Sequence, residues 1–271
     1  MIISKTPSNY KRLFITAPSR SGSSLFTNIL NSLPQIKIAN EPFLNGVPIW
    51  HLDAVNDTYS RLEAEVGTGQ IMQRLENGDE PTDTYPNNKL KWGPVYCDPN
   101  IVTTIGIKVS FPAFSRQYSF KKFIATWKDF ITWMEEINGS VICLIRNPIY
   151  TIMSWKSTFS PLFGSIEHQC LAWNEIVDCF LSIRNNINVI RYEDFTDNFN
   201  ICLTDLLLRL GFKDISPPPV PAIKVTNSLE YYHRIRNLNA EKIFGDIEII
   251  KKLCSKHAYV LGYSLESEMP S

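Results

Sequence analysis

The chain has 271 residues, and its 27 lysine and arginine residues balance its 27 aspartate and glutamate residues. This length is enough for one large α/β domain, although it is also compatible with two small domains. The zero net charge excludes binding to nucleic acid or to an anionic membrane through bulk charge, so any basic site must be local.

The first predicted elements are a short buried strand at residues 13–16 and a helix that carries apolar residues at 25, 26, 29, 30 and 33. A loop of small hydroxyl residues with one arginine and one glycine joins them. Strand, glycine-containing loop and helix form the arrangement that points free backbone N–H groups at an anion. We predict a phosphate or sulfate site here, and the structural alternative is an ordinary serine cap at the start of a helix.

Further strand-like runs occupy residues 36–39, 104–109, 141–145 and 188–191, with helical patterns between them. This alternation predicts an α/β fold with a central parallel sheet flanked by helices. Residues 78–100 are rich in Pro, Asn, Asp and Gly and are predicted to form a long loop. A helical pattern at residues 241–262 is predicted to dock on the sheet.

A second motif lies where the run at 141–145 ends. Arg146 follows five apolar residues, Asn-Pro then opens a helix, and Ser154 stands eight residues after the arginine, about two helical turns on. Arg146 and Ser154 are therefore predicted to face one phosphate at the carboxyl edge of the sheet, where open α/β sheets bind ligands. The alternative for Arg146 is a surface charge at a strand end.

Together, residues 17–25 and 141–155 resemble the two cofactor signatures of the sulfotransferases that use 3′-phosphoadenosine 5′-phosphosulfate (PAPS). The first resembles the 5′-phosphosulfate loop of that family, and the second resembles its 3′-phosphate motif. Residues 191–195 are similar to the family's Tyr-Glu-Asp turn after a strand. The resemblance covers most of the chain except residues 45–100, an expected acceptor-side insertion of loops and helices. It implies one P-loop-like sulfotransferase domain over residues 1–271, of the small soluble bacterial type.

The resemblance also implies roles for individual residues. Arg146 and Ser154 would bind the 3′-phosphate, and Tyr192 would lie near the adenine unless it is a core aromatic residue. The residues expected to bind the 5′-phosphosulfate are Arg20, Ser21, Gly22, Ser23, Ser24 and Leu25. Thr226 would lie near the adenine base, and Arg236 with Arg234 could reach the 3′-phosphate from a C-terminal loop. For the last two, a solvated charge is the alternative.

Lys108 resembles a family lysine that stabilises charge on the leaving phosphate, a role that Arg20 would share. Two residues later, where hormone- and drug-conjugating members of the family have a histidine base, this chain has Ser110. A serine takes up no proton at neutral pH, so the base must be another residue. Glu41, which follows the strand at 36–39, is our candidate, and His51 is the second choice.

These roles predict in-line transfer of a sulfuryl group from PAPS to a hydroxyl or to an amine or guanidine nitrogen of a small-molecule or sugar acceptor, as in natural-product tailoring. No metal is expected, because no His, Cys and Asp cluster has ligand spacing. The alternatives are a P-loop kinase or NTPase, which would place a lysine after the glycine, and a nucleotide-binding domain without activity.

The six cysteines lack Cys-x-x-Cys spacing, which favours reduced and mostly buried thiols. No stretch approaches the roughly 20 apolar residues of a membrane helix, and the N-terminal residues contain no long apolar run. We therefore predict a cytoplasmic protein with no integral membrane segment and no nucleic-acid partner.

Overall fold

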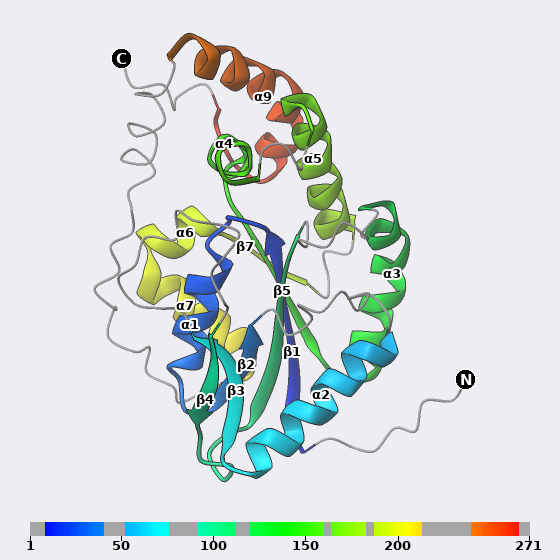
Figure 1. The fold of residues 1–271 in the computed structure, drawn as a ribbon, viewed down its shortest axis with the longest axis vertical. Helices are drawn as coiled ribbons and strands as arrows, with labels where there is room; N and C mark the ends of the chain where they lie inside the picture. Colours follow the sequence, from blue (N-terminus) through cyan, green and yellow to red (C-terminus); the bar gives the residue numbers. More distant parts are fainter. Residues whose placement is uncertain are drawn as a thin grey trace. The chain divides into compact units, whose positions relative to one another are not determined.

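The computed structural model describes residues 9–40, 52–75, 91–111, 120–159, 164–182, 187–212 and 240–265 (Figure 1). The chain divides into two compact units. The first unit comprises Met1–Ile15, Ser24–Val109 and Asp129–Val141, and the second comprises Thr16–Ser23, Ser110–Lys128 and Ile142–Ser271. The expectation of one functional domain over residues 1–271 stays a prediction.

Five strands form a sheet in the order β2-β5-β1-β6-β7. They are β1 (Lys11–Pro18), β2 (Ile36–Asn40), β5 (Thr104–Phe111), β6 (Ser140–Ile145) and β7 (Ile187–Arg191). Each of the five predicted strands is present, and the predicted α/β class with a parallel sheet is confirmed. Every residue of β2, and all of β6 after its first residue, is buried, as expected for strands covered on both faces.

The first unit contains the β2 and β5 pair, which is parallel with Ile36 opposite Thr104 and Asn40 opposite Lys108. Helix α1 (Ser23–Asn31) belongs to this unit except for its first residue. Helix α2 (Leu52–Gly67) packs against β3. Strands β3 (Gln70–Leu75) and β4 (Lys91–Tyr96) form a separate antiparallel pair.

Strand β4 corrects the prediction of a continuous loop over residues 78–100. Gly93 and Pro94 argued against a strand, because both weaken central strands. In a two-stranded pair β4 has an edge that takes no ladder hydrogen bonds, so a proline is tolerated there.

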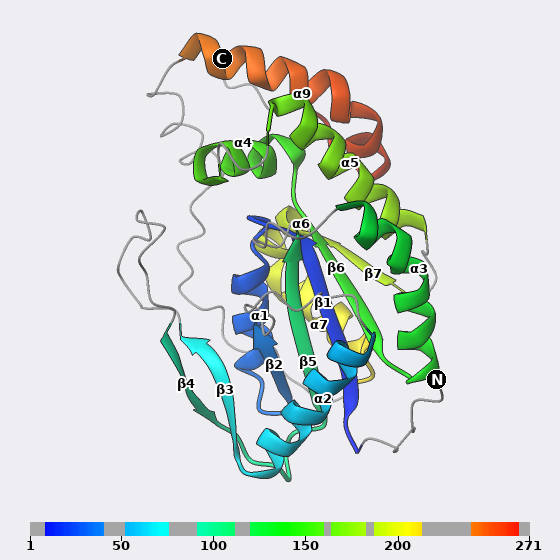
Figure 2. The ribbon, with the colours of Figure 1, turned by 45° about the vertical axis from the view of Figure 1, so that its right-hand side comes forward.

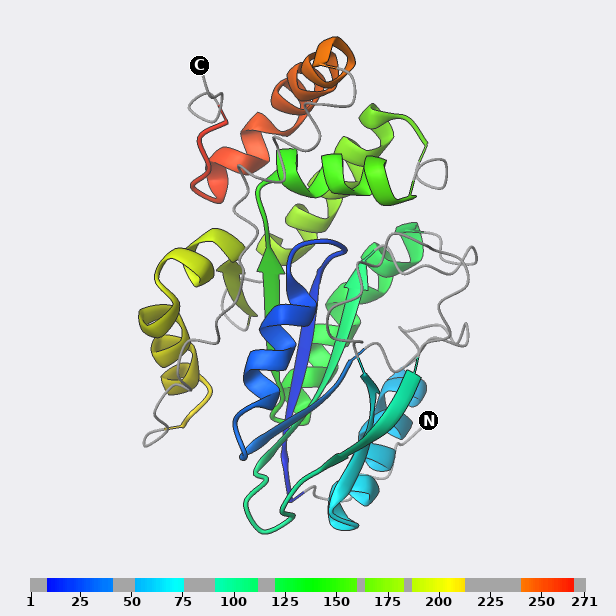
Figure 3. The same ribbon diagram turned by 60° about the vertical axis from the view of Figure 1, so that its left-hand side comes forward.

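The second unit contains a group of packed helices, α4 (Pro148–Phe159), α5 (Ile166–Ser182) and α9 (Ala240–Val260), which lie together in Figures 2 and 3. An ion pair between Lys156 and Asp246 joins α4 to α9, and Asn174 donates to the Leu253 carbonyl at 2.8 Å, which joins α5 to α9. The C-terminal helix therefore packs mainly on α5 and α4. This corrects the prediction that it docks on the sheet.

Two more helices follow β7 in the second unit, α6 (Tyr192–Asp197) and α7 (Phe199–Arg209). Helix α3 (Phe120–Glu136) has its residues up to Lys128 in the second unit and its residues from Asp129 in the first. Within the described ranges, no helix has both the length and the apolar character that a bilayer crossing requires.

Candidate nucleotide site

Residues 19–23, called here the serine loop, connect the end of β1 to the start of α1. Two of them have left-handed backbone conformations, Arg20 at φ +69° and Gly22 at φ +78°. For a non-glycine residue this conformation costs roughly 1–2 kcal/mol, and such strain concentrates at functional sites. Ser21 is fully buried, and its hydroxyl has no hydrogen-bond partner within the part of the chain that the structure describes.

The start of α1 favours a bound anion. The first N–H groups of any α-helix lack an intrahelical acceptor, and the helix dipole places partial positive charge there. The first turn of α1 contains no acidic side chain that would compete for this position. Leu25 lies half-buried in the same turn.

The ring of Tyr192 packs directly against Gly22. A Cβ atom at residue 22 would overlap the edge of that ring, so both the backbone angle and the space demand glycine. Burial raises the pKa of Tyr192, although the neighbouring Arg146 opposes this shift. The phenol therefore stays neutral at physiological pH, and its ring packs against the turn of the serine loop.

Arg146 contacts two aromatic rings. Its guanidinium carbon is 4.9 Å from the centre of the Tyr192 ring and 5.4 Å from that of Tyr150, which lies in the first turn of α4. Cation–π contacts of this kind contribute about 0.5–2 kcal/mol and hold a guanidinium in a defined plane. The arginine is thus oriented by packing before any ligand binds.

Two hydrogen bonds connect the serine loop to the second motif. Arg146 Nη1 donates to the backbone oxygen of Arg20 at 3.3 Å, and Arg20 Nε donates to Ser154 Oγ at 3.1 Å. Ser154 lies on α4 and is 3% exposed. The second unit therefore brings together Arg20, Gly22, Arg146, Ser154 and Tyr192, five residues that the sequence assigned to one cofactor.

The serine loop also contacts the residue that stands at the family's histidine position. Ser23 Oγ and Ser110 Oγ are 3.1 Å apart, and both side chains are buried. Either hydroxyl can donate. Ser110 therefore contacts the serine loop through its hydroxyl, which cannot act as a base near neutral pH.

Lys108 belongs to the first unit and is 2% exposed. Its Nζ lies 3.5 Å from Ser24 Oγ, the hydroxyl that follows Ser23 in the chain. The cation is therefore close to the first turn of α1, where the sequence predicted a role in charge stabilisation.

Five predicted residues lie outside the described residues, namely Glu41, His51, Thr226, Arg234 and Arg236. Their roles stay predictions. Glu41 follows Asn40 in the chain, and Asn40 pairs with Lys108 in the register of β2 and β5.

Two residues that hold this site, Trp155 and Asn147, are not among the site residues predicted from the sequence. Trp155 Nε1 donates to the Ser19 backbone oxygen at 2.7 Å, which anchors the first residue of the serine loop to α4. Asn147, which is fully buried, accepts at Oδ1 from the Ile149 N–H at 2.9 Å and so begins α4. Asn-Pro before a helical pattern is a usable signal for the second contact, because asparagine is a favoured N-cap residue. The tryptophan carried no comparable signal.

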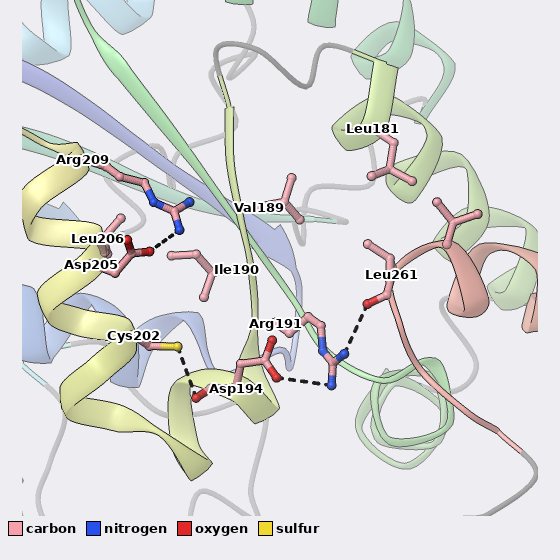
Figure 4. A pocket seen from close by; sticks show the side chains of 11 residues that line it. Leu181, Val189, Ile190, Arg191, Asp194, Cys202, Asp205, Leu206, Arg209 and Leu261 are labelled. Carbon is pink, nitrogen blue, oxygen red and sulfur yellow. Dashed lines mark hydrogen bonds and ion pairs between the residues drawn. The ribbon is translucent and has the colours of Figure 1, made fainter.

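A cavity of about 340 Å³ lies elsewhere in the second unit, beside β7 and α7 (Figure 4). Its wall includes two ion pairs, Arg191 with Asp194 and Arg209 with Asp205. Its lining, as far as the described residues show it, includes none of the residues predicted for the cofactor. Among the described residues there is also no group of three His, Cys, Asp or Glu side chains that could hold a metal ion.

No protein-family model matches the sequence, and no curated protein matches it. Solved structures do. A sulfotransferase from Alicyclobacillus acidocaldarius aligns at 14% identity over 92% of this chain and 97% of its own, with a TM-score of 0.43. The sulfotransferase domain from the curacin biosynthetic pathway aligns at 14% identity over 94% and 98%, with a TM-score of 0.48.

A sulfotransferase from Mycobacterium avium aligns at 11% identity over 96% of this chain and 79% of its own, with a TM-score of 0.45. A possible uridine kinase from Bacillus stearothermophilus aligns at 16% identity over 58% and 87%, with a TM-score of 0.26. Three of these four structures are named as sulfotransferases.

Proposed function

We propose that this protein is a PAPS-dependent sulfotransferase. The observation that carries the proposal is the pair of hydrogen bonds between the serine loop and the second motif, Arg20 to Ser154 and Arg146 to Arg20. A ligand with two separate anionic groups, one at the start of a helix and one beside a strand-end arginine, matches this arrangement. PAPS carries its phosphosulfate on the 5′ side and a phosphate on the 3′ side of one adenosine.

The buried hydroxyl of Ser21, which has no partner among the described residues, supports a ligand at the serine loop. A buried polar group without a partner costs about 1–3 kcal/mol, and a bound oxyanion would remove that cost. Arg20 adds a fork of N–H donors that suits tetrahedral oxyanions. In this proposal, Arg146 and Ser154 bind the 3′-phosphate, and the serine loop with Ser24 and Leu25 surrounds the 5′-phosphosulfate.

The proposed reaction is a single in-line displacement at sulfur. The acceptor oxygen or nitrogen forms a bond to sulfur while the bond between sulfur and the oxygen of the 5′-phosphate breaks. The proton of the acceptor passes to Glu41, or to His51 if Glu41 is not the base. Lys108 and Arg20 stabilise the negative charge on the departing 3′-phosphoadenosine 5′-phosphate (PAP), which is a large electrostatic contribution in enzymes of this kind. Small organic molecules and sugars are the acceptor class that we propose.

The test is a screen for transfer of labelled sulfate from PAPS to phenols, sugars, amines and guanidine compounds. We expect product with at least one class in the absence of added metal, and PAP in equal amount. Hydrolysis of ATP that requires Mg²⁺, without any sulfate transfer, would favour a kinase or NTPase instead. Tight binding of PAP with no transfer to any acceptor would indicate a nucleotide-binding domain without activity, for which Ser110 in place of a histidine is the supporting observation.

A further inference from the structure

The backbone on the two sides of Arg146 contacts Glu193 and Tyr263. Asn147 N–H donates to Glu193 Oε1 at 3.0 Å. The other carboxylate oxygen of Glu193 accepts from the Tyr263 hydroxyl at 2.7 Å, and that hydroxyl also lies 3.4 Å from the Ile145 carbonyl. The two residues that flank Arg146 therefore contact one carboxylate and one phenol.

The phenol comes from residues 261–263, the turn that follows α9 and is called here the C-terminal turn. Tyr263 is 6% exposed. Burial raises the pKa of Tyr263 well above its usual value, and the Glu193 charge adds to this effect. The hydroxyl therefore stays protonated and can donate to the carboxylate throughout the physiological range.

Arg191 fixes the C-terminal turn in place. Its guanidinium lies 4.5 Å from the centre of the Tyr263 ring and donates through Nη1 to the Gly262 carbonyl at 2.9 Å. Gly262 has φ +80°, and a Cβ atom there would lie 2.9 Å from the same Nη1. Figure 4 shows Arg191 reaching toward Asp194 on one side and Leu261 on the other.

These contacts lie next to the cation–π contact between Arg146 and Tyr192. Arg191 and Glu193 flank Tyr192 in the chain, and Glu193 contacts the residue that follows Arg146. A shift of the C-terminal turn would release Glu193, and through it the backbone on which Arg146 stands. Movements of about 1 Å in a binding group are enough to lower affinity or rate substantially.

We propose that Glu193 and Tyr263 form a positioning pair, which holds the Arg146 guanidinium in place for an anionic group of the ligand. Given the proposed function, that group is the 3′-phosphate of PAP or PAPS. Neither Glu193 nor Tyr263 touches the nucleotide in this proposal, and both act through the backbone of residues 145–147. The C-terminal turn thereby becomes part of the nucleotide site.

The test compares PAP with adenosine 5′-phosphate, which lacks the 3′-phosphate, by calorimetry on the full chain. In Tyr263→Phe the dissociation constant for PAP should rise about three- to tenfold, the equivalent of one lost hydrogen bond. Its dissociation constant for adenosine 5′-phosphate should stay within about twofold of wild type, because that nucleotide has no 3′-phosphate for Arg146 to bind. Tyr259→Phe is the matched control, since Tyr259 lies in the last turn of α9, close in sequence to the C-terminal turn, and is 80% exposed.

Two further variants separate positioning from general stability. Glu193→Gln keeps one oxygen acceptor, so it should fall between wild type and Glu193→Ala in affinity for PAP. In an Arg146→Ala background, Tyr263→Phe should have no further effect on PAP binding. Equal weakening of both nucleotides, or an additive effect in the double variant, would overturn the positioning role.

Different results would overturn the proposed function and the positioning pair. A wild-type protein that binds PAP no better than adenosine 5′-phosphate would remove the proposed function and this inference together. A wild type that prefers PAP, with a preference unchanged in Tyr263→Phe and Glu193→Gln, would overturn the positioning pair alone.

Discussion

Arg20 and Ser154 are separated by 134 positions in the sequence, yet Arg20 Nε donates to Ser154 Oγ at 3.1 Å. The contact joins the left-handed turn after β1 to the second helical turn of α4. Both residues were predicted from separate motifs to bind one cofactor. Their contact brings the two motifs together in the second unit.

Gly22→Ala should disrupt the serine loop. The substitution adds strain of roughly 1–2 kcal/mol at a positive φ and drives a methyl group into the Tyr192 ring. We expect the dissociation constant for PAP to rise at least about tenfold, because the loop donors are displaced. Gly67→Ala is the matched control, since Gly67 is exposed and no atom lies within 4 Å of its added Cβ. Equal affinities in the two variants would show that the geometry of the loop does not matter for binding.

Lys108→Met should separate binding from turnover. Methionine keeps much of the buried volume but removes the cation that lies 3.5 Å from Ser24 Oγ. We expect kcat to fall about 100- to 1,000-fold, as when one stabilising donor is removed from a transition state, while PAP affinity changes little. Lys256→Met, at an exposed position of α9, should leave both quantities unchanged. A large loss of PAP affinity with normal kcat would assign Lys108 to binding instead.

Ser110→Ala should lower kcat/KM by about two- to tenfold, because the Ser23 hydroxyl loses its buried partner. The pH profile should keep its shape, since a serine hydroxyl does not titrate near neutral pH. Ser110→Thr retains a hydroxyl and should recover most of the loss. If the limb of the profile at low pH disappeared in the alanine variant, Ser110 would belong to the proton-transfer path after all.

Tyr59→Phe should change how stability depends on pH. Tyr59 is fully buried and donates to the Leu13 carbonyl at 2.7 Å, and burial raises its pKa far above the usual value. The folded protein therefore keeps the phenol proton while the unfolded chain loses it above about pH 10. The contribution of Tyr59 is complete below that pH and is lost as the pH rises further. Relative to Tyr59→Phe, the wild-type free energy of unfolding should fall by about 1.4 kcal/mol per pH unit above pH 10.

Urea unfolding at pH 8, 10 and 11 measures this difference, and Tyr259→Phe serves as the exposed control. A difference between wild type and Tyr59→Phe that stays constant from pH 8 to pH 11 would contradict the burial of a protonated phenol.

The sheet was predictable because its strands are continuous apolar runs. Residues 13–16 and 141–145 are the clearest cases, and both lie inside strands of the structure. Strand β4 was missed because Gly93 and Pro94 carry the signals of a loop. The contacts of α9 with α5 and α4 depend on which faces meet in three dimensions, and helical periodicity shows only that a face is apolar.

In the candidate site, too, some features were predictable from the sequence and others were not. Arg146 and Ser154 could be placed near the serine loop, because carboxyl ends of parallel strands share one edge of a sheet. Tyr192 was predicted near the adenine, and the structure shows its ring against Gly22 and Arg146, where it supports the protein's own site. The contacts of Glu193, Tyr263 and Trp155 join segments that are distant in the sequence. Which residues meet in such contacts depends on the three-dimensional packing, and no period or spacing in the sequence indicates it.

The most direct test of the account is calorimetry of the wild-type protein and of Arg146→Ala with PAP and with adenosine 5′-phosphate. We predict that wild type binds PAP with one site and at least about tenfold more tightly than adenosine 5′-phosphate, since a charged hydrogen bond contributes about 1.5–3 kcal/mol. Arg146→Ala should remove that preference and leave the affinity for adenosine 5′-phosphate unchanged. A wild type that shows no heat with PAP, or that binds both nucleotides equally, would contradict the claim that the serine loop and Arg146 hold one bisphosphorylated nucleotide.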